Sequence, residues 1–243
     1  MEYLAYRFKE GELLPVRHAH VPDFHSLLHI DTQKETLRRN TLQFVKGLPA
    51  NDALLWGDRG TGKSSLVKSM LGLFAKDGLR LVQVYKMDIS HLSELYDLLR
   101  GRQEKFILFF DDLSFEAGDE EVRILKSLMD GDVEERPSNV LVYATSNRRH
   151  LMPEREEEGK FPEESYWERV SLVERFGIRL GFFSFGKEQY LDIVKYLALH
   201  RGLGLEEEEL RRLALEWAMQ RGFSGRSANQ FIKDLEGRLR LKF

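Results

Sequence analysis

Eight consecutive residues have the types and spacing of a phosphate-binding loop. Gly57-Asp58-Arg59-Gly60-Thr61-Gly62-Lys63-Ser64 follows the pattern GxxxxGK[ST]. The three glycines are expected to take positive φ and to turn backbone N–H groups toward phosphate oxygens. Lys63 would neutralise the β and γ phosphates, and the short Ser64 hydroxyl would reach a bridging Mg²⁺ ion. These residues, with Ser65 behind them, predict a site for a nucleoside triphosphate with Mg²⁺.

Two acidic residues follow a continuous apolar run at 106–110. Carboxylates at the end of a buried strand can hold a metal ion or polarise an attacking water. We therefore expect Asp111 to bind Mg²⁺ and Asp112 to activate the water. Asp112 is one methylene shorter than the glutamate usual at this place, so Glu116 is a rival base. A purely structural alternative is that Asp112 caps the strand end.

A polar residue also follows the apolar run at 140–145, where Asn147 stands. An uncharged amide at a strand end can orient the lytic water or contact the γ phosphate without competing for its charge. Asn147 is therefore the predicted phosphate sensor, and Thr145 and Ser146 are its rivals. The structural alternative is an asparagine that satisfies the turn after the strand.

Two arginines could complete the site. Arg175 precedes a predicted strand, from which its guanidinium could enter a neighbouring subunit's site and offset charge developing on the γ phosphate. Arg169 and Arg179 are its rivals, and a surface ion pair is the structural alternative. Arg226 opens the last predicted helix, where an arginine opposes the helix dipole. We therefore expect Arg226 to contact the triphosphate rather than to stabilise the helix, with a solvated side chain as the alternative.

The elements that must position these residues alternate along the chain. Apolar runs predict strands, and helical spacing predicts helices between them. The predicted strands are 53–56, 80–85, 106–110, 140–145 and 178–183, and the predicted helices include 65–74, 90–100 and 120–130. This order is typical of an α/β fold with a five-stranded parallel sheet, covered by helices on both faces. Ligands bind such sheets at the carboxyl ends of the strands, where each polar motif falls.

Three parts are expected along the chain. Residues 1–50 form an N-terminal segment, in which Leu27–Asp31 covers the adenine side and Ile30 contacts the nucleotide. Residues 51–185 form the P-loop α/β domain. Residues 186–243 form a small helical lid with helices at 187–200, 205–220 and 224–239, divided by glycines. The Pro- and Glu-rich stretch 153–165 is predicted to be a surface loop.

Composition excludes several classes of protein. A formal net charge of −3 excludes a globally basic nucleic-acid binder, and the absence of cysteine excludes disulfides and thiolate metal sites. The four histidines between positions 18 and 29 have no metal-ligand spacing. No signal peptide and no apolar run of membrane-spanning length is present, so a soluble cytoplasmic protein is expected.

Taken together, these motifs resemble those of the AAA+ ATPases over nearly the whole chain. The stretches 48–51, 56–68, 110–116 and 143–151 are similar to the bacterial AAA+ group called domain of unknown function 815. In the superfamily, Lys63 would be the Walker A lysine and Asp111 and Asp112 the Walker B pair. The same resemblance implies that Asn147 is sensor 1, Arg175 the arginine finger and Arg226 sensor 2. It also implies ATP hydrolysis and assembly of the chain with itself into a hexamer-like ring or a filament.

The expected function is an oligomeric ATPase whose hydrolysis of Mg-ATP moves the lid and remodels a protein or nucleic-acid client. The alternative is a nucleotide-dependent binding switch or scaffold with weak or no turnover, which the short Asp112 suggests. A GTPase would carry the guanine-reading pattern NKxD after a strand. This chain has Ser146-Asn147-Arg148-Arg149 there instead.

Overall fold

The structure, a computed structural model, describes residues 2–116, 119–130, 135–147 and 170–241. The chain divides into two compact units. The first, the α/β unit, comprises Met1–Phe24, Asp31–Gly57 and Lys63–Gly181. The second, the helical unit, comprises His25–Ile30, Asp58–Gly62 and Phe182–Phe243. The predicted boundaries at residues 50 and 185 stay predictions.

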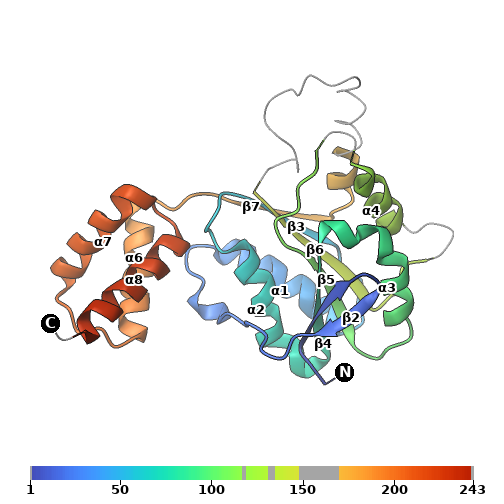
Figure 1. The fold of residues 1–243 in the computed structure, drawn as a ribbon, viewed down its shortest axis with the longest axis horizontal. Coiled ribbons are helices and arrows are strands. Elements are labelled where there is room, and N and C mark those ends of the chain that lie inside the picture. The colour runs from blue at the N-terminus through green and yellow to red at the C-terminus, as the bar shows by residue number, and fades with distance from the viewer. Residues whose placement is uncertain (1, 117–118, 131–134, 148–169, 242–243) are drawn as a thin grey trace. The chain divides into compact units, whose positions relative to one another are not determined.

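A seven-stranded sheet in the order β2-β1-β4-β5-β6-β3-β7 is the centre of the α/β unit (Figure 1). β4, β5, β6 and β3 pair in parallel, β1 is parallel to β4, and β2 is antiparallel to β1. The strands are β1 (Ala5–Lys9), β2 (Glu12–Pro15), β3 (Ala53–Gly57), β4 (Leu79–Val84), β5 (Lys105–Phe110), β6 (Val140–Ser146) and β7 (Ile178–Phe182). The predicted α/β fold with a parallel sheet is confirmed.

The sheet has seven strands rather than the predicted five, because the sequence did not reveal the hairpin of β1 and β2. Its turn is formed by Glu10 and Gly11, both with positive φ, at 50° and 81°. These strands have only five and four residues, so their local pattern is weak. What holds β1 in the sheet is pairing with β4 far along the chain, from Ala5 opposite Leu81 to Phe8 opposite Val84. Pairing over such a distance leaves no local signal.

Helices cover both faces of the sheet. The helices of this unit are α1 (Asp31–Val45), α2 (Lys63–Phe74), α3 (Leu92–Leu99) and α4 (Glu120–Asp130), with a further helical turn at 170–174. In Figure 1, α1 and α2 lie on one side of the strands, and α3 and α4 on the other. β5 is buried on both faces, from Phe106 to Phe110. A strand covered on both faces needs an uninterrupted apolar run, which the sequence provides here.

The helical unit contains α6 (Lys187–His200), α7 (Glu207–Arg221) and α8 (Gly225–Arg240). All three predicted helices are present. Their apolar faces meet around Tyr190, whose hydroxyl donates to the carbonyl of Ala214 at 3.2 Å. Ser224 caps α8 by accepting a hydrogen bond from the Ser227 N–H at 3.1 Å.

Two predicted features, the surface loop at 153–165 and Arg169, lie outside the described residues. Within the described ranges, no helix has both the length and the apolar character needed to cross a membrane.

Candidate functional site

The loop after β3 has the backbone conformation that its glycines predict. Gly57, Gly60 and Gly62 have φ values of 120°, 76° and 102°, a region that favours glycine, so the predicted positive φ is confirmed at all three. Within the helical unit, the Thr61 hydroxyl donates to the carbonyl of Asp58 at 2.8 Å. α2 begins at Lys63, and the N–H groups of a first helical turn have no partners inside the helix. Such an end can bind an anion.

Lys63 is buried at the start of α2, with 6% of its surface exposed. Its ammonium donates to the carbonyl of Gly57 at 2.8 Å and to Oδ1 of Asn147 at 3.2 Å. The amide of Asn147 in turn donates to Oδ1 of Asp112 at 2.5 Å. Asn147 therefore bridges the predicted phosphate-binding lysine and the predicted base. The sequence placed these residues on three separate elements, and the fold brings them together.

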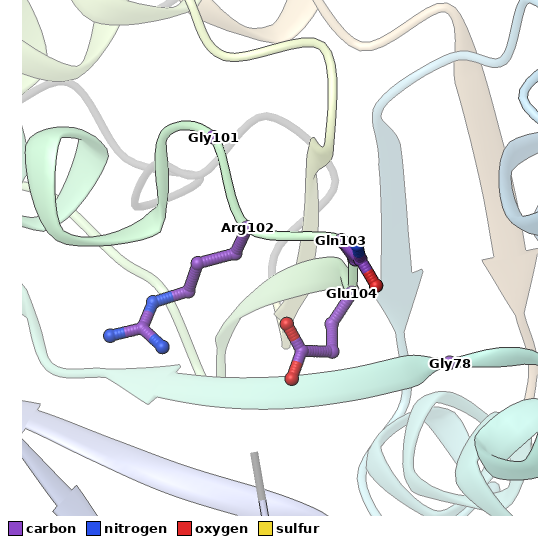
Figure 2. Close-up of a pocket in the computed structure, with 5 residues that line it drawn as sticks. All are labelled: Gly78, Gly101, Arg102, Gln103 and Glu104. Carbon is purple, nitrogen blue, oxygen red and sulfur yellow. The ribbon is translucent and has the colours of Figure 1, made fainter.

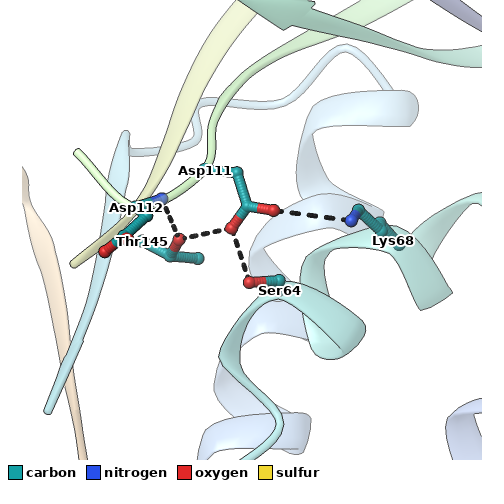
Figure 3. A network of polar contacts seen from close by, with 5 residues as sticks. All are labelled: Ser64, Lys68, Asp111, Asp112 and Thr145. Atoms are coloured by element: carbon teal, nitrogen blue, oxygen red, sulfur yellow. Dashed lines mark hydrogen bonds and ion pairs between the residues drawn. The ribbon is translucent and has the colours of Figure 1, made fainter. Parts of the chain in front are cut away.

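Asp111 lies at the end of β5, beside α2 and β6 (Figure 3). Its Oδ1 accepts hydrogen bonds from the Ser64 hydroxyl at 2.5 Å and from the Thr145 hydroxyl at 2.8 Å. Its Oδ2 accepts from the Lys68 ammonium at 3.5 Å. The two predicted metal ligands, Ser64 and Asp111, are thus in direct contact. A hydroxyl and a carboxylate are hard oxygen ligands, so this pair fits a Mg²⁺ ion.

Thr145 contacts both acidic residues. Besides its bond to Asp111, its Oγ1 accepts a hydrogen bond from the Asp112 N–H at 2.9 Å, and its carbonyl accepts from the Leu113 N–H at 2.7 Å. Asp112 has φ 60°, a conformation that costs a non-glycine residue about 1–3 kcal/mol and persists only where surrounding contacts hold it. Thr145, which the sequence offered as a rival to Asn147, thus holds the backbone that carries Asp112.

The sequence reasoning missed Lys68. A signal existed, because Lys68 follows Ser64 by four residues in a predicted helix and so lies on the same face. Among the rivals named for other roles, Ser146 is fully buried within β6. Glu116 is exposed, and its backbone N–H donates to Asp119 at 2.7 Å.

Arg175 is held within its own α/β unit. Its guanidinium donates to the carbonyl and the hydroxyl of Ser171 and pairs with Asp130 at the end of α4. The side chain is 21% exposed. Arg179 is exposed on β7. The role of Arg175 as a finger for a neighbouring subunit stays a prediction.

The first half of the loop makes its contacts inside the helical unit. The Asp58 N–H donates to the carbonyl of Phe182 at 2.8 Å, and its Oδ2 accepts from the N–H and the hydroxyl of Ser184 at 2.7 and 2.6 Å. Arg59 is exposed. The sequence treated both as variable positions of a phosphate-binding loop, and Asp58 in fact anchors the loop to the segment that leads into α6.

The start of α8 packs against Gly60. The Gly225 N–H donates to the carbonyl of Gly60 at 2.9 Å, and a Cβ atom on Gly60 would lie 3.2 Å from the Cβ of Arg226. Arg226 itself is exposed in this first turn. Ile30 is 4% exposed, and its Cδ1 lies 3.5 Å from where a Cβ of Gly62 would stand. Within the helical unit, Arg226 thus lies near Gly60 and Ile30 near Gly62. The nucleotide-binding roles of Arg226 and Ile30 stay predictions.

A shallow pocket elsewhere on the α/β unit has no part in this arrangement. Figure 2 shows its lining residues, Gly78, Gly101, Arg102, Gln103 and Glu104. It lies where β4 and β5 begin, whereas Asp111 and Asn147 stand where β5 and β6 end. No residue predicted for the nucleotide site lines it.

The family model described as "Protein of unknown function (DUF815)" matches residues 1–239. No curated protein matches the chain in sequence.

Solved structures share its fold. The RuvB Holliday junction branch migration motor of Thermotoga maritima is 16% identical, with a TM-score of 0.62 over 92% of this chain and 66% of that chain. An arginine-to-alanine variant of the same RuvB gives 15% identity and a TM-score of 0.62 over 90% and 65%. The AAA domain of FIGL-1, solved with ADP, is 18% identical, with a TM-score of 0.55 over 86% and 70%.

At such low identity these structures establish the fold, and this chain spans less than two thirds of these two RuvB chains. The family model, in contrast, covers nearly the whole sequence. The predicted resemblance is confirmed, and the chain belongs to the DUF815 family and has the fold of the AAA+ ATPases.

Proposed function

We propose that this protein hydrolyses ATP with Mg²⁺. One observation carries the proposal: Asn147 links the Lys63 ammonium to the Asp112 carboxylate, while Ser64 binds Asp111 next to them. A lysine for phosphate, a hydroxyl and carboxylate pair for a metal, and a second carboxylate for water are the groups that phosphoryl transfer to water requires. The AAA+ fold supports the same assignment.

In this mechanism each group has one task. Water attacks the γ phosphorus, the bond to the β-phosphate oxygen breaks, ADP leaves, and Asp112 accepts the proton that the water loses. Lys63 offsets the negative charge on the transferring group, and Asn147 orients Asp112 and the water through its amide. Mg²⁺, held by Ser64 and Asp111, would supply charge neutralisation on the phosphates. Thr145 keeps Asp111 and Asp112 in place through its hydroxyl.

The basic test is a steady-state ATPase assay on the purified chain. Lys63→Ala and Asp112→Asn should each lower kcat by about a hundredfold or more, since each removes a group that acts on the transferring phosphoryl or the water. Lys76→Ala, at an exposed lysine just after α2, is the matched control and should keep full activity. Turnover that survives Lys63→Ala would refute the site. Loss of turnover in Glu116→Gln but not in Asp112→Asn would move the base to Glu116.

The subunit arrangement forms a second part of the proposal. Arg175 would act in trans in a ring or filament. Its guanidinium would break the ion pair with Asp130 and contact the γ phosphate bound to a neighbouring subunit. If so, Arg175→Ala and Lys63→Ala are each inactive, but mixing them restores activity, because one supplies an intact site and the other an intact finger. Arg179→Ala is the control arginine. No recovery on mixing would count against action in trans.

In this proposal hydrolysis is coupled to motion of the helical unit and to remodelling of a client. Arg226 would contact the triphosphate from the first turn of α8, since its Cβ lies near Gly60. The RuvB neighbour is a branch migration motor, which makes DNA one candidate client for this chain. Light scattering with and without ATP measures assembly. ATPase assays with added DNA, RNA or unfolded protein identify the client class, and a client is expected to stimulate turnover.

One observation favours the alternative of a nucleotide-dependent switch with weak turnover. Oδ1 of the short Asp112 side chain already accepts a hydrogen bond from the Asn147 amide, which makes this carboxylate a weaker acceptor for the proton of the water. In that case ATP binding should change the oligomeric state while kcat stays near background. Turnover well above background that depends on Asp112 would exclude this alternative.

A further inference from the structure

Lys68 places a cation beside the carboxylate that is assigned to the metal. It lies on α2, one turn after Ser64, and its ammonium is 3.5 Å from Oδ2 of Asp111 (Figure 3). The same ammonium lies 5.6 Å from the centre of the Phe109 ring. Both charged side chains are 27% exposed, so water screens the pair only in part. Lys68 and Asp111 are therefore a partly buried ion pair rather than a fully solvated surface contact.

The two oxygens of Asp111 have different partners. Oδ1 accepts from the hydroxyls of Ser64 and Thr145, and Oδ2 accepts from the ammonium of Lys68. The three donors hold the carboxylate in one orientation. These donors also offset part of the negative charge of Asp111. A divalent cation bound to Ser64 and Asp111 would therefore lie close to the positive charge of Lys68. Like charges at that distance repel, most strongly where water is partly excluded.

We propose that Lys68 sets the metal requirement of the site, weakening the binding of Mg²⁺ to Asp111 until a nucleotide is present. The proposal rests on the proposed function, in which Asp111 is a metal ligand. Without nucleotide, the Lys68 ammonium is the cation that pairs with Asp111, and the metal binds poorly. The phosphates of a bound nucleotide add negative charge next to Ser64, which offsets the repulsion and lets the metal bind. Lys68 is thus a positioning residue that makes metal loading depend on nucleotide.

The test measures binding of the metal alone, with Mn²⁺ as a paramagnetic stand-in for Mg²⁺. Mn²⁺ is titrated into the full chain without nucleotide and, separately, with ADP, and the free ion is followed by electron paramagnetic resonance. Lys68→Met removes the charge and keeps the length of the side chain, Lys68→Gln keeps a polar group, and Lys68→Arg keeps the charge. Lys76→Met is the control for a lysine lost elsewhere.

Without nucleotide, Lys68→Met and Lys68→Gln should bind Mn²⁺ at least about fivefold more tightly than the wild type, a change that corresponds to about 1 kcal/mol. With ADP the gain should be smaller. Lys68→Arg and Lys76→Met should match the wild type. Equal or weaker binding in both uncharged variants overturns the proposal.

A double variant separates this proposal from the assignment of Asp111. Adding Asp111→Asn to Lys68→Met should abolish the gain in Mn²⁺ affinity. A gain that persists shows that Lys68 does not act through Asp111, which overturns the inference. If instead Asp111→Asn alone leaves Mn²⁺ binding with ADP unchanged, the metal site of the proposed function is wrong.

Discussion

Replacing Thr145 with valine tests whether one hydroxyl holds both acidic residues of the site. Thr145 is 2% exposed, and valine has nearly the same shape, so packing in β6 should be kept. What is lost is the hydrogen bond to Oδ1 of Asp111 and the acceptor for the Asp112 N–H. The variant therefore changes polar contacts and little else.

The expected cost can be estimated from these two contacts. A hydrogen bond to a charged group contributes about 1.5–3 kcal/mol, and a backbone N–H that loses its acceptor adds about 1 kcal/mol where water cannot reach it fully. The left-handed conformation of Asp112 remains, but one of the bonds that fixed it is gone. We expect the free energy of unfolding to fall by about 2.5–4 kcal/mol, the sum of these two contributions. We expect kcat for ATP to fall with it, because the Asp112 carboxylate is no longer fixed.

Urea unfolding followed by circular dichroism measures the stability, and the midpoint should fall by about 1–2 M for a chain with an m value of about 2–3 kcal/mol/M. Thr145→Ser keeps the hydroxyl and is the matched control, so it should retain more of both stability and kcat than the valine variant. A valine variant as stable as the wild type, or a serine variant that loses as much as valine, would refute the argument from the hydroxyl.

Three further predictions follow from particular contacts. Burial raises the pKa of Tyr143 to about 12, while a tyrosine in the unfolded chain ionises near 10. Between these two pH values the unfolded chain loses the phenol proton and the folded protein keeps it, which favours unfolding. Stability should therefore fall by about 1.4 kcal/mol between pH 9 and pH 11 on this account, and urea unfolding of Tyr143→Phe at both pH values should lack that loss. At pH 7 the free energy of unfolding of Tyr96→Phe should be higher than that of the wild type or lower by no more than about 1 kcal/mol. The reason is that the buried Tyr96 hydroxyl has no hydrogen-bond partner among the described residues. Gly225→Ala would place a methyl 3.2 Å from the carbonyl of Gly60 and should weaken binding of fluorescent ADP several-fold, whereas Gly237→Ala in open space on the same helix should not.

The sequence predicted the parts of the site that follow from strand order. Asp111 and Asn147 end two apolar runs, and those runs are adjacent parallel strands, so both polar ends meet at one edge of the sheet. The positive φ of the loop glycines follows from the motif alone, since no other residue adopts that turn as readily. Buried runs such as 106–110 are the strongest signal of all, because a strand covered on both faces is apolar over most of its length.

The elements that the sequence missed are those stabilised by polar or distant contacts. α1 has few apolar residues, and part of its buried face is Asn40 and Thr41. Both contact the hydroxyl of Tyr143 in β6, each at 2.9 Å. A buried polar network of this kind hides the helical pattern, because its residues have the composition of an exposed surface. Lys68 was missed for a related reason: a lysine in a helix usually has a solvated side chain, and only the fold shows that this one faces a carboxylate.

The phosphate-binding motif itself explains where the contacts particular to this chain are found. The pattern fixes the residues at 57, 62, 63 and 64 and leaves the four between them free. Two of those free positions make hydrogen bonds from the loop to other segments of the helical unit, Asp58 to Ser184 and Gly60 to Gly225. A carboxylate in such a loop would repel phosphate if it faced the ligand, and the two donors of Ser184 hold it in another contact. The unspecified positions are therefore free to make contacts within the helical unit, because phosphate binding does not constrain them.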